Sequence, residues 1–342
     1  MKKQLGEIAN LKYGKMPNKD LIRDSGYPIF TGYKISGFYP IYMYDKSVII
    51  IVARGVGGTG DVKIAPPKSF ITNLSIIVDI INDKLINKKY LQLLLGSLNL
   101  RNLDSGSAQS QITIAALSKV ELDLPKKDIQ DEIASKIELI ERKIQLNKRI
   151  NDNLISLATT LFNKYFPNIN SGNEMIGNFI SNYDRLRKPL SKKERLSIPG
   201  KYRYIGATSV NDYINKYNFD GIYLLLGEDG TVEDDNGYPI LQYISGKFWP
   251  NNHAHVLQGK NVSTEWLYLF FKQRKITSIV TGAVQKKISQ KNLNSLSISI
   301  PDKDKLARFD TIINPIFKNI RIIESENHSL EKIKLELLSK LF

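Results

Sequence analysis

The sequence of 342 residues contains no cysteine. A disulfide framework, a thiolate metal site and a cysteine nucleophile are therefore excluded. Long apolar runs are also missing, since no stretch reaches the ~18 consecutive apolar residues of a membrane-spanning helix. The first residues, Met1–Glu7, lack the apolar segment of a secretory signal. We therefore expect a soluble protein of the cytoplasm.

Acidic residues are the scarcer charged type. The chain has 49 Lys and Arg against 34 Asp and Glu, which gives a net charge of +15 and a pI near 9.5. Such an excess is typical of proteins that bind polyanions. A Lys-rich proteome coded by an AT-rich genome is the alternative explanation, because Ile and Asn are abundant too. The charge favours nucleic acid as the partner.

The sequence contains an internal repeat. Gly106–Ile112 (Gly-Ser-Ala-Gln-Ser-Gln-Ile) corresponds to Gly282–Ile288 (Gly-Ala-Val-Gln-Lys-Lys-Ile), 176 residues further on (282 − 106). Pro125 and Pro301, which each end a short apolar strand, are displaced by the same number (301 − 125). Self-similarity over this distance indicates a duplicated domain rather than a solenoid, and two domains of ordinary size fit the chain length.

The segment before the first long helix predicts a compact α+β domain with a strong β component. Residues 27–30, 47–53 and 70–78 are short apolar runs bounded by turn signals, as in buried strands. Residues 88–95 predict a helix. The second copy has the same order of elements, but its resemblance to the first is one of pattern rather than identity. The two domains should therefore share a scaffold and present different surfaces.

A long amphipathic helix should follow Pro125. Its apolar positions step alternately by four and three, the spacing of a coiled-coil seam. These positions are Ile133, Ile137, Ile140, Ile144, Asn147, Asn151, Leu154, Ala158 and Leu161. Asparagines on a seam cost stability but select register and partner. An ordinary amphipathic helix lying on a core is the alternative interpretation.

A second helix of the same kind should follow Pro301. Its seam includes Asn327 and changes phase through Ile333, Leu337 and Leu341. Measured to the final Leu-Phe of each run, it is longer by about one helical turn, with 41 residues (342 − 301) against 37 (162 − 125). We expect the two helices to pair antiparallel and to hold the two domains at opposite ends of a rod.

No motif in the sequence predicts catalysis. Gly55–Gly60 fits a dinucleotide-binding pattern, but a strand broken by prolines follows where a helix is needed, so a hairpin turn is expected. Asn314–Phe317 lies on a helix seam and should be core. Without a third ligand, His253 and His255 are better explained as structural histidines. Glu141–Lys143 lies on a helix flank without a partner carboxylate.

Basic and amide side chains in the irregular segments are the candidates for contacts with DNA. Arg, Lys, Gln and Asn read base edges, and Lys mostly contacts phosphate. The candidates are Lys15, Lys19, Tyr33, Lys34 and Arg54; Arg185, Arg187, Lys188 and Lys192; and, in the doubled loop, Gln109, Gln111, Gln285, Lys286 and Lys287. For each one alone, an ordinary solvated surface residue is the alternative.

The whole pattern resembles the specificity subunit of type I restriction-modification enzymes. A variable β-rich domain, a Gly-x-x-Gln-x-x-Ile loop, an apolar strand ending in Pro and a long helix all occur twice. The most specific features are Gly282–Ile288 leading to Ile300-Pro301, and the stretch Trp249–Leu257. The first loop departs from the second, because Ser110 and Gln111 stand where the second copy has a basic pair.

The resemblance implies an α+β protein with two target-recognition domains, residues 1–124 and 167–300, held apart by antiparallel spacer helices, residues 125–166 and 301–342. Each domain would read one half of a split site on double-stranded DNA. The subunit would have no catalysis and no cofactor of its own. Two methyltransferase subunits and restriction or translocase subunits would join it and bring S-adenosylmethionine, Mg²⁺ and ATP.

Two other classes of protein remain open at this point. One is a single-chain nuclease or methyltransferase, which would turn over substrate without partners. The other is a scaffold protein that pairs through the rod and binds RNA through its charge. Competition between duplex DNA and RNA at raised salt distinguishes the scaffold protein from a DNA reader, because the affinity of non-specific binding falls steeply as the salt concentration rises.

Overall fold

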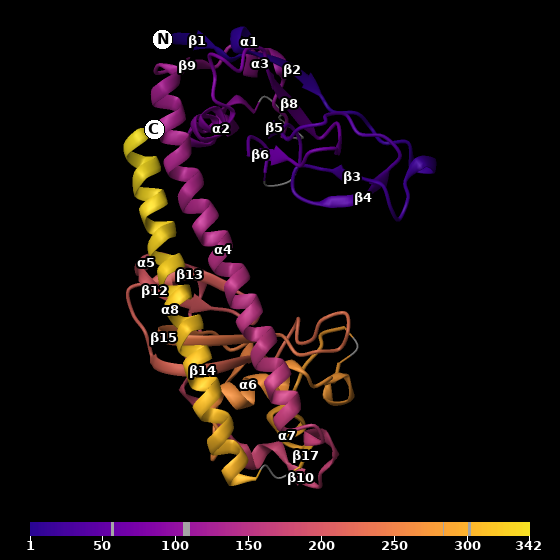
Figure 1. The fold of residues 1–342 in the computed structure, drawn as a ribbon, viewed down its shortest axis with the longest axis vertical. Coiled ribbons are helices and arrows are strands. Elements are labelled where there is room, and N and C mark those ends of the chain that lie inside the picture. The colour runs from indigo at the N-terminus through magenta and orange to yellow at the C-terminus, as the bar shows by residue number, and fades with distance from the viewer. Residues whose placement is uncertain (56–57, 105–109, 283, 300–301) are drawn as a thin grey trace. The chain divides into compact units, whose positions relative to one another are not determined.

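The computed structural model describes residues 1–342 except 56–57, 105–109, 283 and 300–301 (Figure 1). The chain forms two compact units. Unit 1 consists of Met1–Gln145 with His328–Phe342, and unit 2 of Leu146–Asn327. The two longest helices each contribute to both units, so each unit contains parts of both.

Unit 1 is built on two sheets. The four-stranded antiparallel sheet has the order β2 (Ala9–Tyr13), β8 (Ser75–Ile80), β5 (Val48–Val52) and β6 (Val62–Ala65). The three-stranded sheet has the order β4 (Ile35–Tyr39), β3 (Tyr27–Phe30) and β7 (Phe70–Ile71). The predicted strand over 70–78 is therefore two strands, because a turn at Asn73 divides it.

The central strand β5 explains why this sheet forms. All five of its β-branched residues are buried, as expected for a strand covered on both faces. Ile49 and Ile51 belong to the cluster that contains Tyr90 and Leu94 of α2 (Lys88–Ser97). Ile50 lies in a separate cluster on the other face. Residues 56–57 of the Gly-rich stretch after β5 lie outside the described residues. The stretch is followed by β6, which pairs antiparallel with β5, and not by the helix that a phosphate-binding turn needs.

Unit 2 is built on one sheet of six strands. Their order is β11 (Ile180–Asn182), β16 (Ala254–Gly259), β14 (Phe219–Gly227), β15 (Leu241–Pro250), β12 (Pro199–Ile205) and β13 (Val210–Ile214). Helix α6 (Thr264–Lys272) packs against it and places Trp266 and Phe270 in the largest buried cluster. Helix α6 is the counterpart of the helix predicted at 88–95, so the same order of elements predicted for the second copy is confirmed at this point.

Shorter elements complete both units. The remaining strands are β1 (Lys2–Gln4), β9 (Glu121–Asp123), β10 (Glu174–Met175) and β17 (Ser297–Ile298). The remaining α-helices are α1 (Leu5–Ile8), α3 (Ile114–Ser118), α5 (Lys192–Ser197) and α7 (Gln290–Asn294). The 3-10 helices are η1 (Lys19–Leu21), η2 (Leu100–Leu103), η3 (Ile169–Ser171), η4 (Ile176–Phe179), η5 (Asp184–Leu186) and η6 (Thr277–Ile279).

The internal repeat is visible in matching backbone hydrogen bonds. In unit 1, the Ile112 N–H donates to the Ala53 carbonyl over 3.0 Å, and the Ala53 N–H donates to Leu74 over 2.8 Å. In unit 2, Ile288 donates to Glu228 over 2.9 Å, and Glu228 donates to His253 over 2.9 Å. The paired segments β1–β9 and β10–β17 correspond in the same way. The duplication predicted from the sequence thus extends to the sheet frame.

The two long helices are equal in length. Helix α4 (Lys127–Tyr165) and helix α8 (Lys303–Leu341) each have 39 residues. The predicted excess of one turn in the second helix is wrong, because α4 continues beyond Leu161 to the residue before Phe166-Pro167. The predicted phase change is wrong too: Ile333 is exposed, and Lys334 takes the seam position and donates to Glu141 of α4 over 2.6 Å.

Helices α4 and α8 pack antiparallel, as predicted (Figure 1). Within unit 2, Phe162 of α4 lies 5.8 Å from Phe309 of α8, between ring centroids. Asn147 of α4 donates from its side-chain amide to the Asn327 Oδ1 atom over 2.9 Å. As the residue numbers rise along α4, the residue numbers of its contacts on α8 fall, which is the pattern of antiparallel helices. The seam asparagines pair with each other, which is the arrangement that selects register in coiled coils.

Two residues predicted to be core are at the surface. Asn314 and Pro315 of α8 are exposed, whereas Phe317 is fully buried. The apolar seam passes through Ile313, Phe317 and Ile320, so the Asn-Pro pair lies beside it. None of the helices in the described parts of the chain combines the length and the apolar character needed to cross a membrane.

Candidate nucleic-acid interface

The second copy of the repeated loop is a closed hairpin. Thr281 and Lys287 exchange both backbone hydrogen bonds, each 2.8 Å long, and the Gly230 N–H donates to the Lys286 carbonyl over 3.0 Å. Gly282 has φ +90°, and a Cβ there would lie 2.1 Å from the Gln285 carbonyl oxygen. Only glycine fits this position. The backbone therefore presents the exposed residues from Val284 to Lys287 in a defined geometry.

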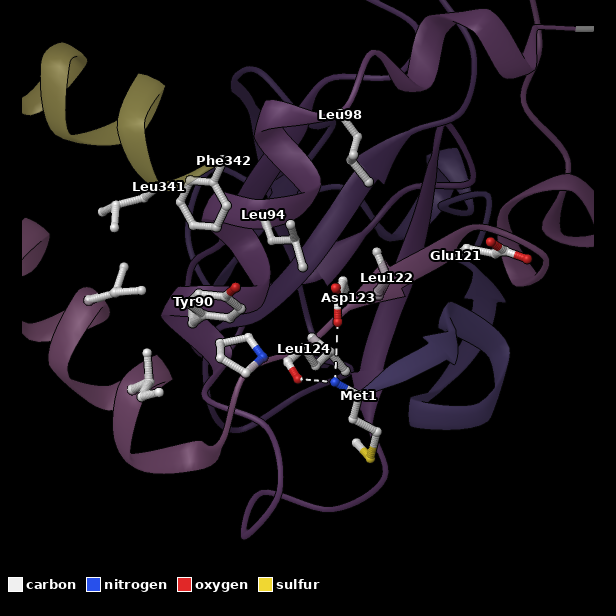
Figure 2. Close-up of a pocket in the computed structure, with 13 residues that line it drawn as sticks. Met1, Tyr90, Leu94, Leu98, Glu121, Leu122, Asp123, Leu124, Leu341 and Phe342 are labelled. Atoms are coloured by element: carbon white, nitrogen blue, oxygen red, sulfur yellow. Dashed lines mark hydrogen bonds and ion pairs between the residues drawn. The ribbon is translucent and has the colours of Figure 1, made fainter.

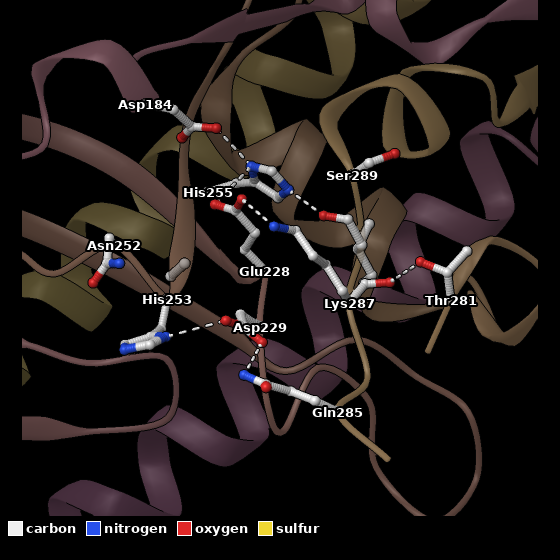
Figure 3. Close-up of polar contacts among 12 residues, drawn as sticks. Asp184, Glu228, Asp229, Asn252, His253, His255, Thr281, Gln285, Lys287 and Ser289 are labelled. Carbon is white, nitrogen blue, oxygen red and sulfur yellow. Dashed lines mark hydrogen bonds and ion pairs between the residues drawn. The ribbon is translucent and has the colours of Figure 1, made fainter. Parts of the chain in front are cut away.

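Acidic partners orient the polar side chains of this loop (Figure 3). The Gln285 amide donates to Asp229 Oδ1 over 2.6 Å. The Lys286 ammonium lies 2.8 Å from Glu233, whose pKa the hydrogen bonds of Lys286 and Thr277 lower. The Lys287 ammonium lies 3.9 Å from Glu228. All three loop side chains remain exposed, so a phosphate or a base edge can exchange for these surface contacts.

A buried histidine holds the base of the loop. The His255 side chain is 1% exposed, and its Nε2 atom lies 2.9 Å from the Ile288 carbonyl oxygen. A carbonyl can only accept, so Nε2 carries a proton. The Nδ1 atom lies 2.6 Å from Asp184 Oδ2. Burial raises the pKa of Asp184, but the hydrogen bond and charge of His255, together with hydrogen bonds from Val256 and Asn182, leave that pKa below its usual value.

Arg187 supplies the positive charge of the same network. Its guanidinium donates to Glu228 over 2.6 Å and to the Ala254 carbonyl over 2.6 Å, and lies 3.6 Å from Asp184. Among the described residues, the ligand atoms of Asp184, Glu228 and His255 come within 4.8 Å of one another, as in a metal site. The guanidinium already pairs with both carboxylates, so the geometry is that of an internal ion-pair network. His253 lies outside it, 3.7 Å from Asp229.

Unit 1 supports the corresponding loop with different chemistry. The Tyr13 hydroxyl lies 3.5 Å from the carbonyl oxygen of Ile112, the counterpart of Ile288. The Arg54 guanidinium lies over the Tyr13 ring, 5.7 Å from its centroid, and Arg54 forms an isolated β-bridge with Gln111. The Gln111 N–H donates to Asp104 over 2.7 Å. One frame thus carries a Tyr–Arg pair in one unit and an Asp–His–Arg–Glu network in the other.

A family model described as "Type I restriction modification DNA specificity domain" matches residues 1–155 and 180–335. The chain belongs to this family. It is the non-catalytic specificity subunit, which recognises the DNA target within a type I restriction-modification complex.

Individual relatives agree with this assignment. A putative type I specificity subunit from Mycoplasma pneumoniae is 25% identical over 362 aligned positions, which cover 100% of this chain and 95% of that protein. A putative type I restriction enzyme specificity subunit from Haemophilus influenzae is 33% identical over 127 residues. That alignment spans 37% of this chain and only 31% of the length of the Haemophilus protein.

A solved structure shows the same fold. The crystal structure of the S subunit of a type I restriction-modification system from M. genitalium aligns with a TM-score of 0.64 and 19% identity. The alignment covers 100% of this chain and 96% of that one. The predicted architecture, an α+β fold of two β-rich domains with two long helices packed together, is therefore confirmed for this specificity subunit.

The predicted contact residues of unit 1 have mixed environments. Lys15, Lys19, Lys34 and Arg54 of the specificity subunit are exposed, and Gln111 is half-buried. Gln109 lies outside the described residues. The Tyr33 hydroxyl donates to Asp61 over 2.9 Å, and burial together with this hydrogen bond raises its pKa to about 12. Tyr33 therefore stays neutral and can stack or donate.

In unit 2, the predicted contact residues divide into two groups. Gln285, Lys286 and Lys287 converge on the hairpin loop, while Arg185, Lys188 and Lys192 are exposed elsewhere. The Arg187 side chain is 12% exposed and lies within the ion-pair network. Arg187 was predicted to be a surface cation. Of its two acidic partners only Asp184 is near it in the chain, and Glu228 is distant, so the sequence does not reveal the network.

One basic and aromatic cluster was missed from the sequence. Tyr202 and Tyr217 form an edge contact with centroids 4.9 Å apart. The Lys201 ammonium lies 5.4 Å from the Tyr202 ring, and the Lys247 ammonium lies 4.5 Å from the Tyr217 ring. Tyr217 is exposed and Tyr202 is half-buried, and aromatic rings at the surface with Lys beside them suit stacking and phosphate contact. Strand pairing brings these residues together, so no contiguous motif could have revealed them.

Proposed function

We propose that the chain reads a bipartite DNA target, one half through residues 1–124 and the other through residues 167–300. The observation that carries this proposal is the shared frame with different side chains. Arg54 and Gln111 face each other in unit 1, where Asp229 and Lys287 do so in unit 2. The identity of the side chains decides which bases are read, whereas contacts with the DNA phosphates only position the protein. Two domains with the same frame and different side chains therefore suit two unlike half-sites.

The contacts with DNA fall into two classes in this proposal. Gln285 reads a base edge, while Lys286 and Lys287 contact phosphates, as these residue types commonly do. Lys15, Lys19, Tyr33, Lys34, Arg54, Gln109, Gln111, Arg185, Lys188 and Lys192 provide the other contacts. Arg187 acts from inside the network by fixing the acidic residues beside the loop.

The spacer helices, residues 125–166 and 301–342, set the distance between the half-sites. Their antiparallel packing and the asparagine pair on their seam support this role. The complex that forms on them would contain two methyltransferase subunits and restriction or translocase subunits, which bring S-adenosylmethionine, Mg²⁺ and ATP. It would work in the cytoplasm, next to the genome.

A domain exchange tests the bipartite reading. Residues 167–300 are replaced by the corresponding domain of a relative with another target, and methylated positions are mapped in cells that express the hybrid with its partner subunits. We expect one half-site to change while the other half-site and the spacer stay the same. Simultaneous change of both half-sites would contradict the proposal. Turnover of substrate by the purified chain alone would contradict its non-catalytic role.

A further inference from the structure

Arg54 of unit 1 and Asp229 of unit 2 occupy the same position beside their repeated loops. Each forms an isolated antiparallel bridge with a loop residue, Arg54 with Gln111 and Asp229 with Lys287. Gln111 and Lys287 are themselves related by the repeat distance of 176 residues (287 − 111). Side chains of opposite charge therefore stand at one position of the duplicated frame.

The surface beside both side chains is open. Arg54 is exposed, and the Asp229 side chain is 25% exposed. A glycine follows each of them, Gly55 and Gly230, and a Cβ added at either would have no atom of the described residues within 4 Å apart from its chain neighbours. The space that a base edge needs is therefore present next to both positions.

The apolar groove of unit 1 is a separate place (Figure 2). It has a volume of about 620 Å³, and Tyr90, Leu122 and Phe342 are among the residues that line it. Neither Arg54 nor residues 110–112, which the structure describes in the first repeated loop, belong to this lining. Contacts made by Arg54 are therefore independent of the groove.

The Asp229 carboxylate keeps capacity to accept further hydrogen bonds (Figure 3). Its Oδ1 atom accepts from the Gln285 amide over 2.6 Å, and its Oδ2 atom lies 3.7 Å from Nδ1 of the exposed His253. An ionised carboxylate has about four acceptor sites. Glu228 and Glu233 are instead held by an arginine at 2.6 Å and a lysine at 2.8 Å. Of these three carboxylates, Asp229 is therefore the one best placed to accept from a base.

The chemistry of a carboxylate favours cytosine among the four bases. In the major groove, cytosine presents its N4 amino group as a donor, whereas guanine O6 and N7 and thymine O4 are acceptors. The N6 amino group of adenine stands beside the N7 acceptor, which would repel a carboxylate. The exposed ammonium groups of Lys286 and Lys287 offset the repulsion between Asp229 and the DNA phosphates.

The Arg54 guanidinium has the opposite chemistry. It only donates hydrogen bonds, and its planar fork matches the O6 and N7 acceptors of guanine. The guanidinium lies over the Tyr13 ring, 5.7 Å from its centroid, and the Tyr13 hydroxyl is 3.5 Å from the Ile112 carbonyl oxygen. The contact with Tyr13 therefore holds the guanidinium beside the loop.

We infer that Asp229 reads the N4 amino group of a cytosine in one half-site and that Arg54 reads a guanine in the other. Both assignments rest on the proposed reading of two half-sites, and they name the bases that two of its residues recognise. Asp229 is thus a specificity-determining residue, although it is acidic in a chain whose other candidate contacts are basic, amide or aromatic.

A modified base tests the cytosine contact. Domain exchange first identifies the half-site that residues 167–300 read, and each cytosine in it is replaced in turn by deoxyzebularine, which lacks the N4 amino group. At one position we expect the reconstituted wild-type complex to lose about tenfold in affinity, while the complex with Asp229→Ala loses less than about twofold. Weaker base pairing affects both complexes equally, so the difference between them measures the contact.

Two results would overturn the assignment of Asp229. One is an equal loss in both complexes at every cytosine, and the other is a half-site without any G·C pair. Failure of the proposed function is distinguishable from both, because the domain exchange would then leave the half-sites unchanged.

The analogue 7-deazaguanine, which lacks the N7 acceptor, tests the guanine contact in the other half-site. At one guanine we expect a loss of about fivefold for the wild-type complex and less than about twofold for the complex with Arg54→Ala. Equal losses for both complexes at every guanine would overturn the assignment of Arg54.

Gln285→Ala separates a direct contact of Asp229 from an indirect one. If Asp229 touches the base, the complex with Gln285→Ala still loses about tenfold on the deoxyzebularine DNA. Asp220→Asn is the control, because exposed Asp220 lies near the first residue of β14 whereas Asp229 follows its last, so the loss should stay the same. If the loss disappeared in Gln285→Ala, Asp229 would only orient the glutamine, and its assignment would be overturned.

Discussion

His255 and Tyr13 show how single residues adapt a repeated frame. Both side chains reach the carbonyl of the isoleucine that follows the repeated loop, Ile288 in unit 2 and Ile112 in unit 1. The tyrosine has the Arg54 guanidinium over its ring, whereas the histidine contacts the Asp184 carboxylate through its other nitrogen. Each loop is thus anchored at the same atom by a different chemical group.

His255→Phe should destabilise unit 2. The change removes both hydrogen bonds and leaves the buried carboxylate of Asp184 with a partner fewer, so we expect a loss of about 3–5 kcal/mol in the free energy of unfolding. Urea unfolding of the full chain measures it. His253→Phe is the matched control, since His253 is exposed and should change stability by less than about 0.5 kcal/mol. Equal losses in both variants would contradict the anchoring role of His255.

The Asp184 network also predicts a pH dependence. The pKa of Asp184 is lower in the folded chain than its usual value. Such a carboxyl group stabilises the fold above its unfolded pKa and loses that contribution as the pH falls through its folded pKa. The free energy of unfolding of the wild type should therefore fall more steeply below about pH 4 than that of Asp184→Asn.

Urea titrations from neutral to acid pH measure this difference. Asp220→Asn serves as the control. Because Asp220 is exposed, its replacement should not change how the free energy of unfolding falls at acid pH. If this free energy fell equally steeply in the wild type and in Asp184→Asn, the network would not contribute to stability.

The loop side chains predict two separate effects on DNA. Lys287→Gln should weaken binding uniformly across sequences and reduce the salt slope by about 0.9, because one phosphate contact is lost. Gln285→Ala should instead relax the preference at one base pair. DNA titrations of the reconstituted complex at several salt concentrations separate the two effects. The control is Lys318→Gln, which removes the charge of an exposed lysine of α8. If the salt dependence of the affinity were unchanged in Lys287→Gln, Lys287 would not contact a phosphate.

At the scale of the element, the seam of the long helices follows from the sequence better than their relative lengths. The 3–4 spacing is a local property, so Ile137, Ile144 and the paired asparagines were identified from the sequence. The excess of one turn was wrong because the first helix was measured only to Leu161-Phe162, whereas α4 continues to Tyr165. Ile333 was misassigned to the seam because a lysine, Lys334, occupies the seam position and pairs with Glu141.

The asparagine pair should behave as a coupled unit. Asn147→Leu leaves Asn327 with its amide partner missing, so we expect a loss of about 1–3 kcal/mol. The double variant Asn147→Leu, Asn327→Leu should recover that loss, because two apolar residues then meet on the seam. Its register should loosen, which mapping of the methylated spacer would detect. Additive effects of the two single changes in thermal unfolding would contradict the coupling.

At the scale of the whole molecule, the duplication and the fold class follow from the sequence because the repeat, the charge and the seam are patterns along the chain. The candidate interface follows less well. Asp184 and His255 lie 71 positions apart, and Tyr217 joins Lys247 only through strand pairing. Contacts of this kind depend on register and side-chain direction, which a single sequence does not specify.

The spacer proposal makes a quantitative prediction for the molecule. Insertion of seven residues into each of α4 and α8, between the Glu141–Lys334 and Asn147–Asn327 pairs, preserves the phase of the seam. It adds about 10 Å of helix, so the spacer between the half-sites should grow by about three base pairs. Methylation mapping measures the spacer. Altered half-sites with an unchanged spacer would contradict the proposal.

The matching frames of the two units separate the position of a loop from the side chains that it carries. Ile112 and Ile288 hold the two loops through equivalent backbone hydrogen bonds, each within its own unit. Side-chain changes in a loop leave these backbone contacts intact. The contacts that one unit offers can therefore change by substitution alone, while its scaffold is inherited unchanged.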